Sequence, residues 1–110
     1  MSAKFEIRKS TNAKYYFNLK AGNGEIILTS EMYEAKASAI HGIESVKNNA
    51  GQEARFHRKT SQSGQPYFNL VAANGEVIGT SEMYDKKEAM ENGILSVSKN
   101  AEGAESADQT

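Results

Sequence analysis

Three short segments near the start of the chain are typical of strands: the first two alternate apolar and polar residues with a period of two, and the third is a β-branched apolar run. They lie at residues 5–8, 16–21 and 26–29. The pair Asn23-Gly24 separates the second segment from the third, and it favours a type I′ turn because both central positions of that turn need a positive φ. The pattern therefore predicts three strands, of which the last two form a tight hairpin.

After Tyr33 the apolar residues change to the i, i+3, i+4, i+7 spacing of one helix face. The residues at this spacing are Ala39, Gly42, Ile43 and Val46. We expect a helix near residues 35–48. A glycine inside a helix costs about 1 kcal/mol relative to alanine, so its presence on the apolar face predicts close packing of the helix on the sheet.

Shifted by 51 residues, the sequence matches itself without a gap. The clearest matches pair Tyr16-Phe17-Asn18-Leu19 with Tyr67-Phe68-Asn69-Leu70, Asn23-Gly24-Glu25 with Asn74-Gly75-Glu76, and Thr29-Ser30-Glu31-Met32-Tyr33 with Thr80-Ser81-Glu82-Met83-Tyr84. A repeat of this length indicates that the chain consists of two copies of one structural unit. We predict an α+β fold of two β-β-β-α units, residues 4–50 and 55–101, related by a pseudo-twofold axis.

The two units are too short to bury a stable core separately, so we expect one domain over residues 1–101. Its six strands should form one mainly antiparallel sheet with both helices on the same face. The second helix is expected near residues 86–99, where Asp85 and Glu88 have the spacing of a capping box. Residues 102–110 are acidic, small and without apolar period, which predicts a disordered tail.

The repeated core also resembles a known family. The motif Phe-Asn-Leu-x-Ala-x-Asn-Gly-Glu, followed by Thr-Ser-Glu-Met-Tyr, is similar to that of the YegP-like family of small uncharacterised bacterial proteins. The resemblance covers residues 4 to 101 and implies a tandem β-β-β-α fold in which the halves share one sheet. It brings no activity, cofactor or site residue with it.

Composition narrows the class of protein further. The chain has no cysteine, which excludes disulfides, thiolate zinc sites and cysteine nucleophiles and fits a reducing compartment. No apolar run approaches the roughly 20 residues of a membrane span, and the charged first residues do not resemble a secretory signal. We therefore expect a cytoplasmic protein without a membrane association.

Residues for metal or cofactor chemistry are scarce. The two histidines, His41 and His57, have no histidine counterparts in the other unit, and we interpret both as surface residues. No nucleotide-binding or nucleophile motif occurs, and the glycine-rich Ala-Gly-Asn-Gly-Glu segment precedes a strand rather than the helix that a phosphate cradle requires. We expect no metal site and no cofactor.

Glu31 and Glu82 are the best acidic candidates, because they are equivalent and lie beside hydroxyl residues. A pseudo-twofold axis that brought both carboxylates together would permit acid–base chemistry on a small molecule. The structural alternative is that the segment caps the helix, with Glu31 complementing the helix dipole, Met32 in the core and Tyr33 as a half-buried anchor. We favour the structural alternative and expect no enzymatic activity.

The first strand of each unit is basic, and together these strands hold 6 of the 13 basic residues. These six are Lys4, Arg8, Lys9, Arg55, Arg58 and Lys59. With Tyr16 and Tyr67 available for base stacking, single-stranded nucleic-acid binding is a second possible function. The role of charges in guarding sheet edges counts against it, as do Glu6, Glu25 and Glu76 among the same strands.

The leading interpretation is a non-catalytic binding module that uses the sheet face opposite the helices. Tyr16 and Asn18, like their counterparts Tyr67 and Asn69, present the same two polar groups on that face in both units, beside Lys20. Asparagine is a poor strand former, so its double occurrence points either to recognition or to bracing of the sheet. A protein or peptide partner fits such a surface better than a nucleic acid.

Overall fold

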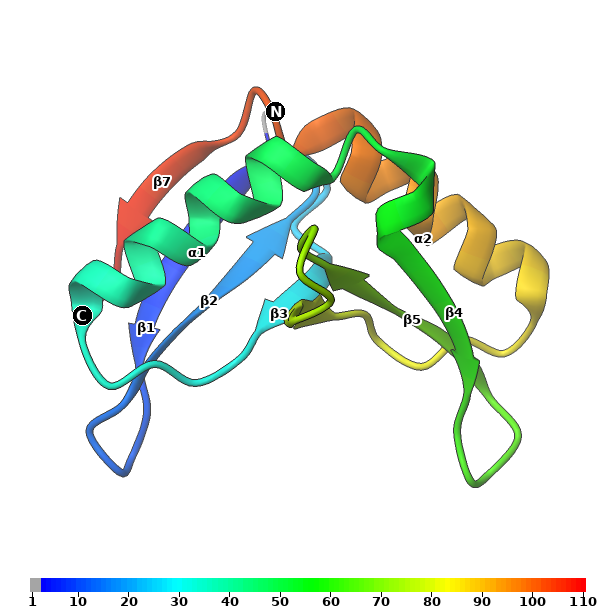
Figure 1. Ribbon diagram of the computed structural model, residues 1–110, viewed down its shortest axis with the longest axis horizontal. Coiled ribbons are helices and arrows are strands. Elements are labelled where there is room, and N and C mark those ends of the chain that lie inside the picture. The colour runs from blue at the N-terminus through cyan, green and yellow to red at the C-terminus, as the bar shows by residue number, and fades with distance from the viewer. Residues whose placement is uncertain (1–2) are drawn as a thin grey trace.

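A computed structural model describes residues 3–110 and has an α+β architecture with one seven-stranded sheet (Figure 1). In chain order the elements are β1 (Lys4–Lys9), β2 (Tyr15–Lys20), β3 (Ile26–Ser30), α1 (Lys36–Asn49), the short 3-10 helix η1 (Glu53–Arg55), β4 (Phe56–Thr60), β5 (Pro66–Val71), β6 (Val77–Thr80), α2 (Lys87–Asn100) and β7 (Glu105–Asp108). The predicted order of three strands and one helix, occurring twice, is confirmed.

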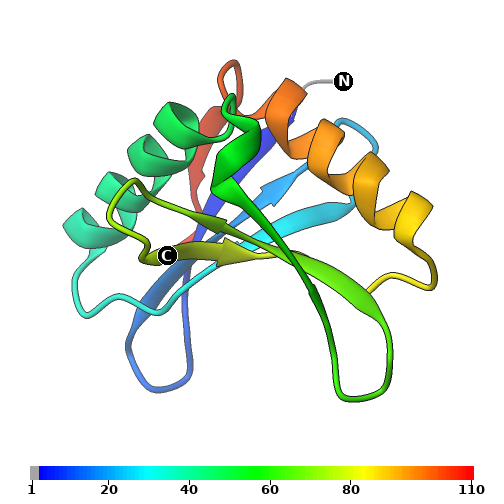
Figure 2. The ribbon, with the colours of Figure 1, turned by 45° about the vertical axis from the view of Figure 1, so that its right-hand side comes forward.

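The two units join into one sheet through their third strands. The strand order is β4-β5-β6-β3-β2-β1-β7, and β3 pairs with β6 in antiparallel orientation. Thr29 lies opposite Thr80 in this pair, and the two residues are equivalent under the 51-residue shift. The pseudo-twofold axis therefore passes between them. Both helices cover one side of the sheet, and the β1–β2 and β4–β5 hairpins project toward the other (Figure 2).

The tail was predicted to be disordered, and this prediction is wrong for residues 105–108. These residues form β7, which pairs in parallel with β1 and places Ser106 beside Phe5. The amide of Gln109 donates to the carbonyl oxygen of Ile7 at 2.8 Å, and Lys36 of α1 forms an ion pair with Asp108. Backbone hydrogen bonds and one ion pair hold the segment, and neither leaves a periodic pattern in the sequence.

The turn between β2 and β3 also differs from the prediction. Gly24 has a φ of 87°, whereas Asn23 is absent from the residues with positive φ. The Gly24 amide donates to the Ala21 carbonyl at 2.9 Å, and the Ala21 amide donates to the Glu25 carbonyl at 2.9 Å. This is the three-residue loop that ends on a left-handed glycine rather than a type I′ turn. The second unit repeats the loop with Gly75 at a φ of 88°.

The expected helix caps are not formed. Lys86 is the N-cap residue of α2 and makes no side-chain capping hydrogen bond, so Asp85 and Glu88 do not form a capping box. In the first unit α1 begins at Lys36, and its first turn contains no acidic residue. Glu31 therefore does not complement the helix dipole as expected. Met32, expected in the core, is 52% exposed.

The glycines on the apolar helix faces leave room for tyrosine rings. Tyr33 stacks on Phe17 with ring centroids 6.4 Å apart, and its hydroxyl lies under α1 at Gly42. A Cβ atom built on Gly42 would lie 2.5 Å from the Tyr33 hydroxyl oxygen. Tyr84, Phe68 and Gly93 repeat the arrangement in the second unit. The close packing of each helix at its glycine, which the sequence predicted, is confirmed, and the group that lies against the glycine is the tyrosine hydroxyl.

Gly42→Ala should lower the free energy of unfolding by about 1–2 kcal/mol, because overpacking costs about 1–3 kcal/mol and outweighs the helix propensity gained. Adding Tyr33→Phe removes the hydroxyl that the new methyl group meets, so the double variant should recover part of the loss. Urea titration of the two single variants and the double variant measures the coupling. Equal stability of Gly42→Ala and the parent protein would contradict the packing described.

At one core position the two units have side chains of very different size. Leu28 is fully buried beside the pseudo-twofold axis, and its counterpart in the second unit is Gly79. A Cβ atom on Gly79 would lie 2.8 Å from the Leu28 Cγ atom and 3.1 Å from the Thr29 carbonyl oxygen. A single leucine from the first unit therefore fills the core on both sides of the axis.

Candidate functional site

A row of polar side chains crosses the sheet face that the helices leave open. The strand register aligns Glu6, Asn18, Thr29, Thr80, Asn69 and His57, one residue from each of six neighbouring strands. We call these six residues the polar row. Within it the Asn18 side-chain amide donates to the Thr29 hydroxyl at 3.0 Å, and the Thr80 hydroxyl donates to the Asn69 side-chain oxygen at 2.9 Å.

These bonds give the two asparagines a role in folding. Asn18 is only 5% exposed, and each asparagine braces the strand beside it through a threonine. The bracing alternative therefore accounts for their double occurrence. Tyr16 lies opposite Arg8, and Tyr67 lies opposite Lys59 on the far half of the sheet. Binding through the open face stays a prediction that rests on these two tyrosines.

Glu6, at one end of the polar row, is a buried carboxylate although it occupies a polar position of the alternating pattern in residues 5–8. It is 5% exposed and forms ion pairs with Lys20 at 3.0 Å, Lys4 at 3.4 Å and Arg8 at 2.5 Å. The hydrogen bond from Lys20, with those from Arg8 and Lys4, outweighs burial and lowers the pKa of Glu6 from 4.5 to about 2.

The same contacts reduce the positive charge available to a nucleic acid. Of the six basic residues on the first strands, Lys4 and Arg8 are paired with Glu6. Arg58 lies on the helix side of β4, where it is paired with Glu53 and with Glu91 of α2. Lys20, which was a candidate binding residue, also contacts Glu6. These contacts weaken the case for a phosphate-binding surface on this face.

The segment after β3 is held in place by Ser30. The Ser30 hydroxyl accepts a hydrogen bond from the Phe17 amide at 2.9 Å and donates to the Glu31 carbonyl at 2.8 Å. Tyr33 then exchanges two backbone hydrogen bonds with Tyr15, at 2.7 and 2.8 Å. These bonds fix the backbone on both sides of Glu31. The second unit repeats the serine bonds through Ser81.

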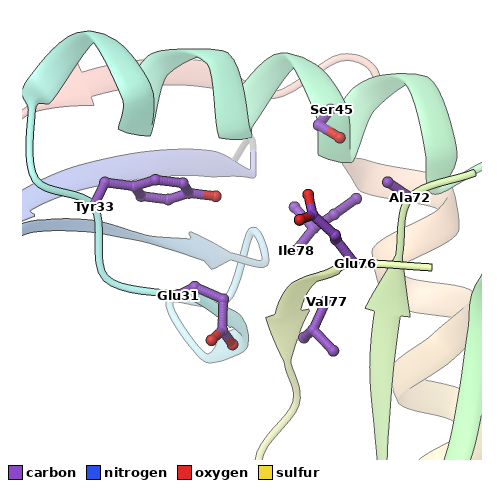
Figure 3. A pocket seen from close by; sticks show the side chains of 7 residues that line it. All are labelled: Glu31, Tyr33, Ser45, Ala72, Glu76, Val77 and Ile78. Atoms are coloured by element: carbon purple, nitrogen blue, oxygen red, sulfur yellow. The ribbon is translucent and has the colours of Figure 1, made fainter. Parts of the chain in front are cut away.

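Glu31 lines a cavity of about 410 Å³ that both units build (Figure 3). The first unit contributes Glu31, Tyr33 and Ser45, and the second contributes Ala72, Glu76, Val77 and Ile78. The ring of Tyr33 lies beneath α1 with its hydroxyl pointing into the cavity, and Glu76 reaches in from the hairpin between β5 and β6. Two carboxylates and two hydroxyl groups thus line the cavity together with the apolar residues Ala72, Val77 and Ile78.

The pseudo-twofold axis generates a second cavity, of about 450 Å³. Glu82 and Tyr84 come from the second unit, and the hairpin of the first unit contributes Gly24, Glu25, Ile26 and Ile27. We call the two cavities the junction pockets. Glu25 and Glu76 were not among the predicted site residues, because their pairing with the other unit's glutamate depends on how the units meet.

Glu31 and Glu82 do not meet at the axis. Each lies two residues beyond the opposed Thr29–Thr80 pair, in opposite directions, which separates them by about 13 Å at 3.3 Å per residue. They line different junction pockets. The acid–base pair that the sequence suggested for these two residues is therefore not formed.

The tyrosine in each junction pocket is kept protonated. Burial raises the pKa of Tyr33, and the negative charges of Glu31 and Glu76 raise it further. Burial, Glu82 and Glu25 act in the same way on Tyr84. Each hydroxyl is therefore a hydrogen-bond donor or acceptor near neutral pH rather than a phenolate.

Neither a metal centre nor a membrane-spanning segment was found in the part of the chain that the structure describes. No cluster of three or more histidine, cysteine, aspartate or glutamate residues there has the geometry to hold a metal ion. No helix within residues 3–110 is long and apolar enough to cross a membrane. His41 and His57 are both exposed and lie on different elements.

Comparison with known proteins gives consistent matches. The family model described as "Domain of unknown function (DUF1508)" matches residues 10–56 and again residues 61–108. A UPF0339 protein of Bordetella pertussis is 55% identical over 104 residues, covering 94% of each chain. The UPF0339 protein YegP of Escherichia coli O157:H7 is 49% identical over 110 residues, covering 100% of each chain.

Two solved structures share the fold. A solution structure of the E. coli protein of unknown function yegP superimposes with a TM-score of 0.94 at 48% identity, covering 100% of this chain and 95% of that one. A solution structure of a UPF0339 protein of Shewanella oneidensis gives a TM-score of 0.91 at 49% identity, covering 98% and 92%. The relatives are described by family or as proteins of unknown function.

Proposed function

The chain belongs to the DUF1508 family of bacterial proteins. From its surface we propose that it is a non-catalytic binding module, and that its junction pockets hold cationic side chains of a protein or peptide partner. One observation carries this proposal. Each junction pocket combines Glu31 or Glu82 from one unit with Glu76 or Glu25 from the other. The duplication therefore builds two equivalent acidic sites that neither unit has alone.

The chemistry of the pocket wall favours an alkyl cation. In the first pocket the carboxylates of Glu31 and Glu76 would accept charge-assisted hydrogen bonds from a bound cation, and Tyr33 adds a neutral hydroxyl. Val77 and Ile78 supply apolar contact beside these groups. An arginine or lysine side chain has an aliphatic stem and a cationic end, so it matches both parts of the wall.

The arrangement supports binding better than catalysis. A general acid–base pair needs two groups that converge on one reacting atom, and Glu31 and Glu82 line separate pockets. The raised pKa of Tyr33 also disfavours its use as a base near neutral pH. Absence of cysteine supports a cytoplasmic site of action for such a module.

The proposal predicts binding of a synthetic glycine–serine peptide that carries two arginine residues. Titration into ¹⁵N-labelled protein should shift the backbone amides of residues 31–33 and 76–78, and the equivalent amides in the second pocket. Glu31→Gln with Glu82→Gln should weaken binding about tenfold or more, because each lost charge-assisted bond is worth about 1.5–3 kcal/mol.

Two controls separate this binding from general attraction between charges. Glu44→Gln with Glu88→Gln removes the same charge from exposed sites on the helices outside the pockets and should leave the affinity unchanged. A peptide with citrulline in place of arginine keeps the shape, loses the charge and should not bind. Equal weakening by both pairs of substitutions, or no pocket shifts, would refute the proposal.

A further inference from the structure

The two outer edges of the sheet are equivalent under the repeat but differ in what covers them. β1 carries β7 along its outer side, whereas β4 pairs only with β5 among residues 3–110. We propose that the free edge of β4 docks an extended acidic segment of another protein, which adds as a strand parallel to β4 in the way that β7 adds to β1. This site shares no residue with the junction pockets, so either proposal can fail alone.

The pairing of β7 with β1 supplies the template for the bound strand. Ile7 lies beside Asp108 in the parallel register, and Asp108 reaches Lys36 at the start of α1. The 51-residue shift places Arg58 at the position of Ile7 and Lys87 at the position of Lys36. The edge of β4 therefore has the same backbone frame and a lysine in the same place. An aspartate bound there would lie within reach of Lys87, as Asp108 does of Lys36.

Two adjoining cavities follow β4 along its helix side. One, of about 370 Å³, lies between the end of β4 and the start of α2, and the other, of about 210 Å³, continues toward Phe56 and the exposed Leu95. Arg58 and Glu91 line both cavities. We call the two together the β4 groove. It leaves space beside β4 for the side chains of an added strand.

The positive charges beside the β4 groove favour a partner strand that carries carboxylates. Lys59 and Lys87 line the groove and form no ion pair within residues 3–110. Arg58 is held by Glu53 and Glu91, so the two lysines are the cations left for a ligand. The positive residues along β4 oppose pairing of two β4 edges, because identical charges would meet. A strand carrying carboxylates meets no such repulsion from them.

The test uses a labelled synthetic peptide with the sequence of residues 101–110 as the probe and the full chain as the receptor. Titration into ¹⁵N-labelled protein should shift the amides of residues 56–60 and 87–91, and bound peptide should slow hydrogen exchange along β4. Lys87→Glu should weaken binding at least tenfold. Lys99→Glu, at the exposed far end of the same helix, is the matched control and should not change the affinity.

A charge swap makes the test specific. A peptide whose aspartate is replaced by lysine should bind the parent protein at least tenfold more weakly and should recover affinity for the Lys87→Glu variant. Shifts confined to residues 4–7, which would mean that the peptide displaces β7 from β1, would overturn the proposal. Absence of binding at millimolar peptide, or equal losses in Lys87→Glu and Lys99→Glu, would overturn it as well.

Discussion

Replacing Ile43 or Ile94 by alanine should lower the free energy of unfolding by about 2–4 kcal/mol, the usual cost of removing a large buried side chain. The two residues occupy equivalent central positions on the buried faces of α1 and α2 and are 2% and 4% exposed. Each closes the core between its helix and the sheet. Because the units share one sheet, both substitutions should shift a single cooperative transition.

Urea denaturation followed by circular dichroism measures the loss, and α1 contains a control of the same residue type. Ile40 lies one turn from Ile43 and is 44% exposed, so Ile40→Ala should cost less than about 1 kcal/mol. A cost below half a kcal/mol for Ile43→Ala or Ile94→Ala would show that the residue is not in the core. Two separate transitions would show that the units unfold independently.

Glu6→Gln should destabilise the protein by about 2 kcal/mol at neutral pH and remove part of its acid sensitivity. The folded state lowers the pKa of Glu6 from 4.5 to about 2. A lowered pKa contributes stability that is complete above pH 4.5 and is lost as the pH falls toward 2. The full shift corresponds to about 3 kcal/mol, and partial solvation of Lys4 and Arg8 reduces it.

The pH dependence gives a sharper test than the stability at one pH. Unfolding free energies of the parent should rise between about pH 2 and pH 4.5, and this rise should be smaller in Glu6→Gln. Glu44→Gln, on the exposed face of α1, should keep the slope of the parent. Identical slopes for the parent and Glu6→Gln would mean that the three cations do not stabilise the buried carboxylate.

The local pattern of the sequence was sufficient to predict most of the architecture. Strand alternation and the helix stripe of Ala39 to Val46 depend on neighbours close in the chain, and the 51-residue repeat is visible when the sequence is compared with itself. All three match the structure. β7 was missed because Glu105 to Asp108 are held by backbone bonds to a strand about a hundred residues earlier in the chain. No side-chain periodicity records such a pairing.

The candidate site was predicted less well, because it depends on the contact between units. Glu31 and Glu82 were identified as candidates, but whether the two meet at the axis depends on a register that only the β3–β6 pairing reveals. Glu76 lies in a turn of the second unit, and it lines the same pocket as Glu31 because the first unit packs beside that turn. The burial of Glu6 is likewise invisible in sequence, since β7 and Lys20 contribute to it.

The core space beside the pseudo-twofold axis is filled by Leu28 of the first unit, whereas the second unit has Gly79 at the equivalent position. The two units therefore cannot replace one another. A homodimer of the first half would place two leucines in a space that admits one, and a homodimer of the second half would leave that space empty. Fusion of the two copies into one chain removed the demand that both sides of the axis be identical. The covalent link therefore permits an asymmetric core that no assembly of identical halves can reproduce.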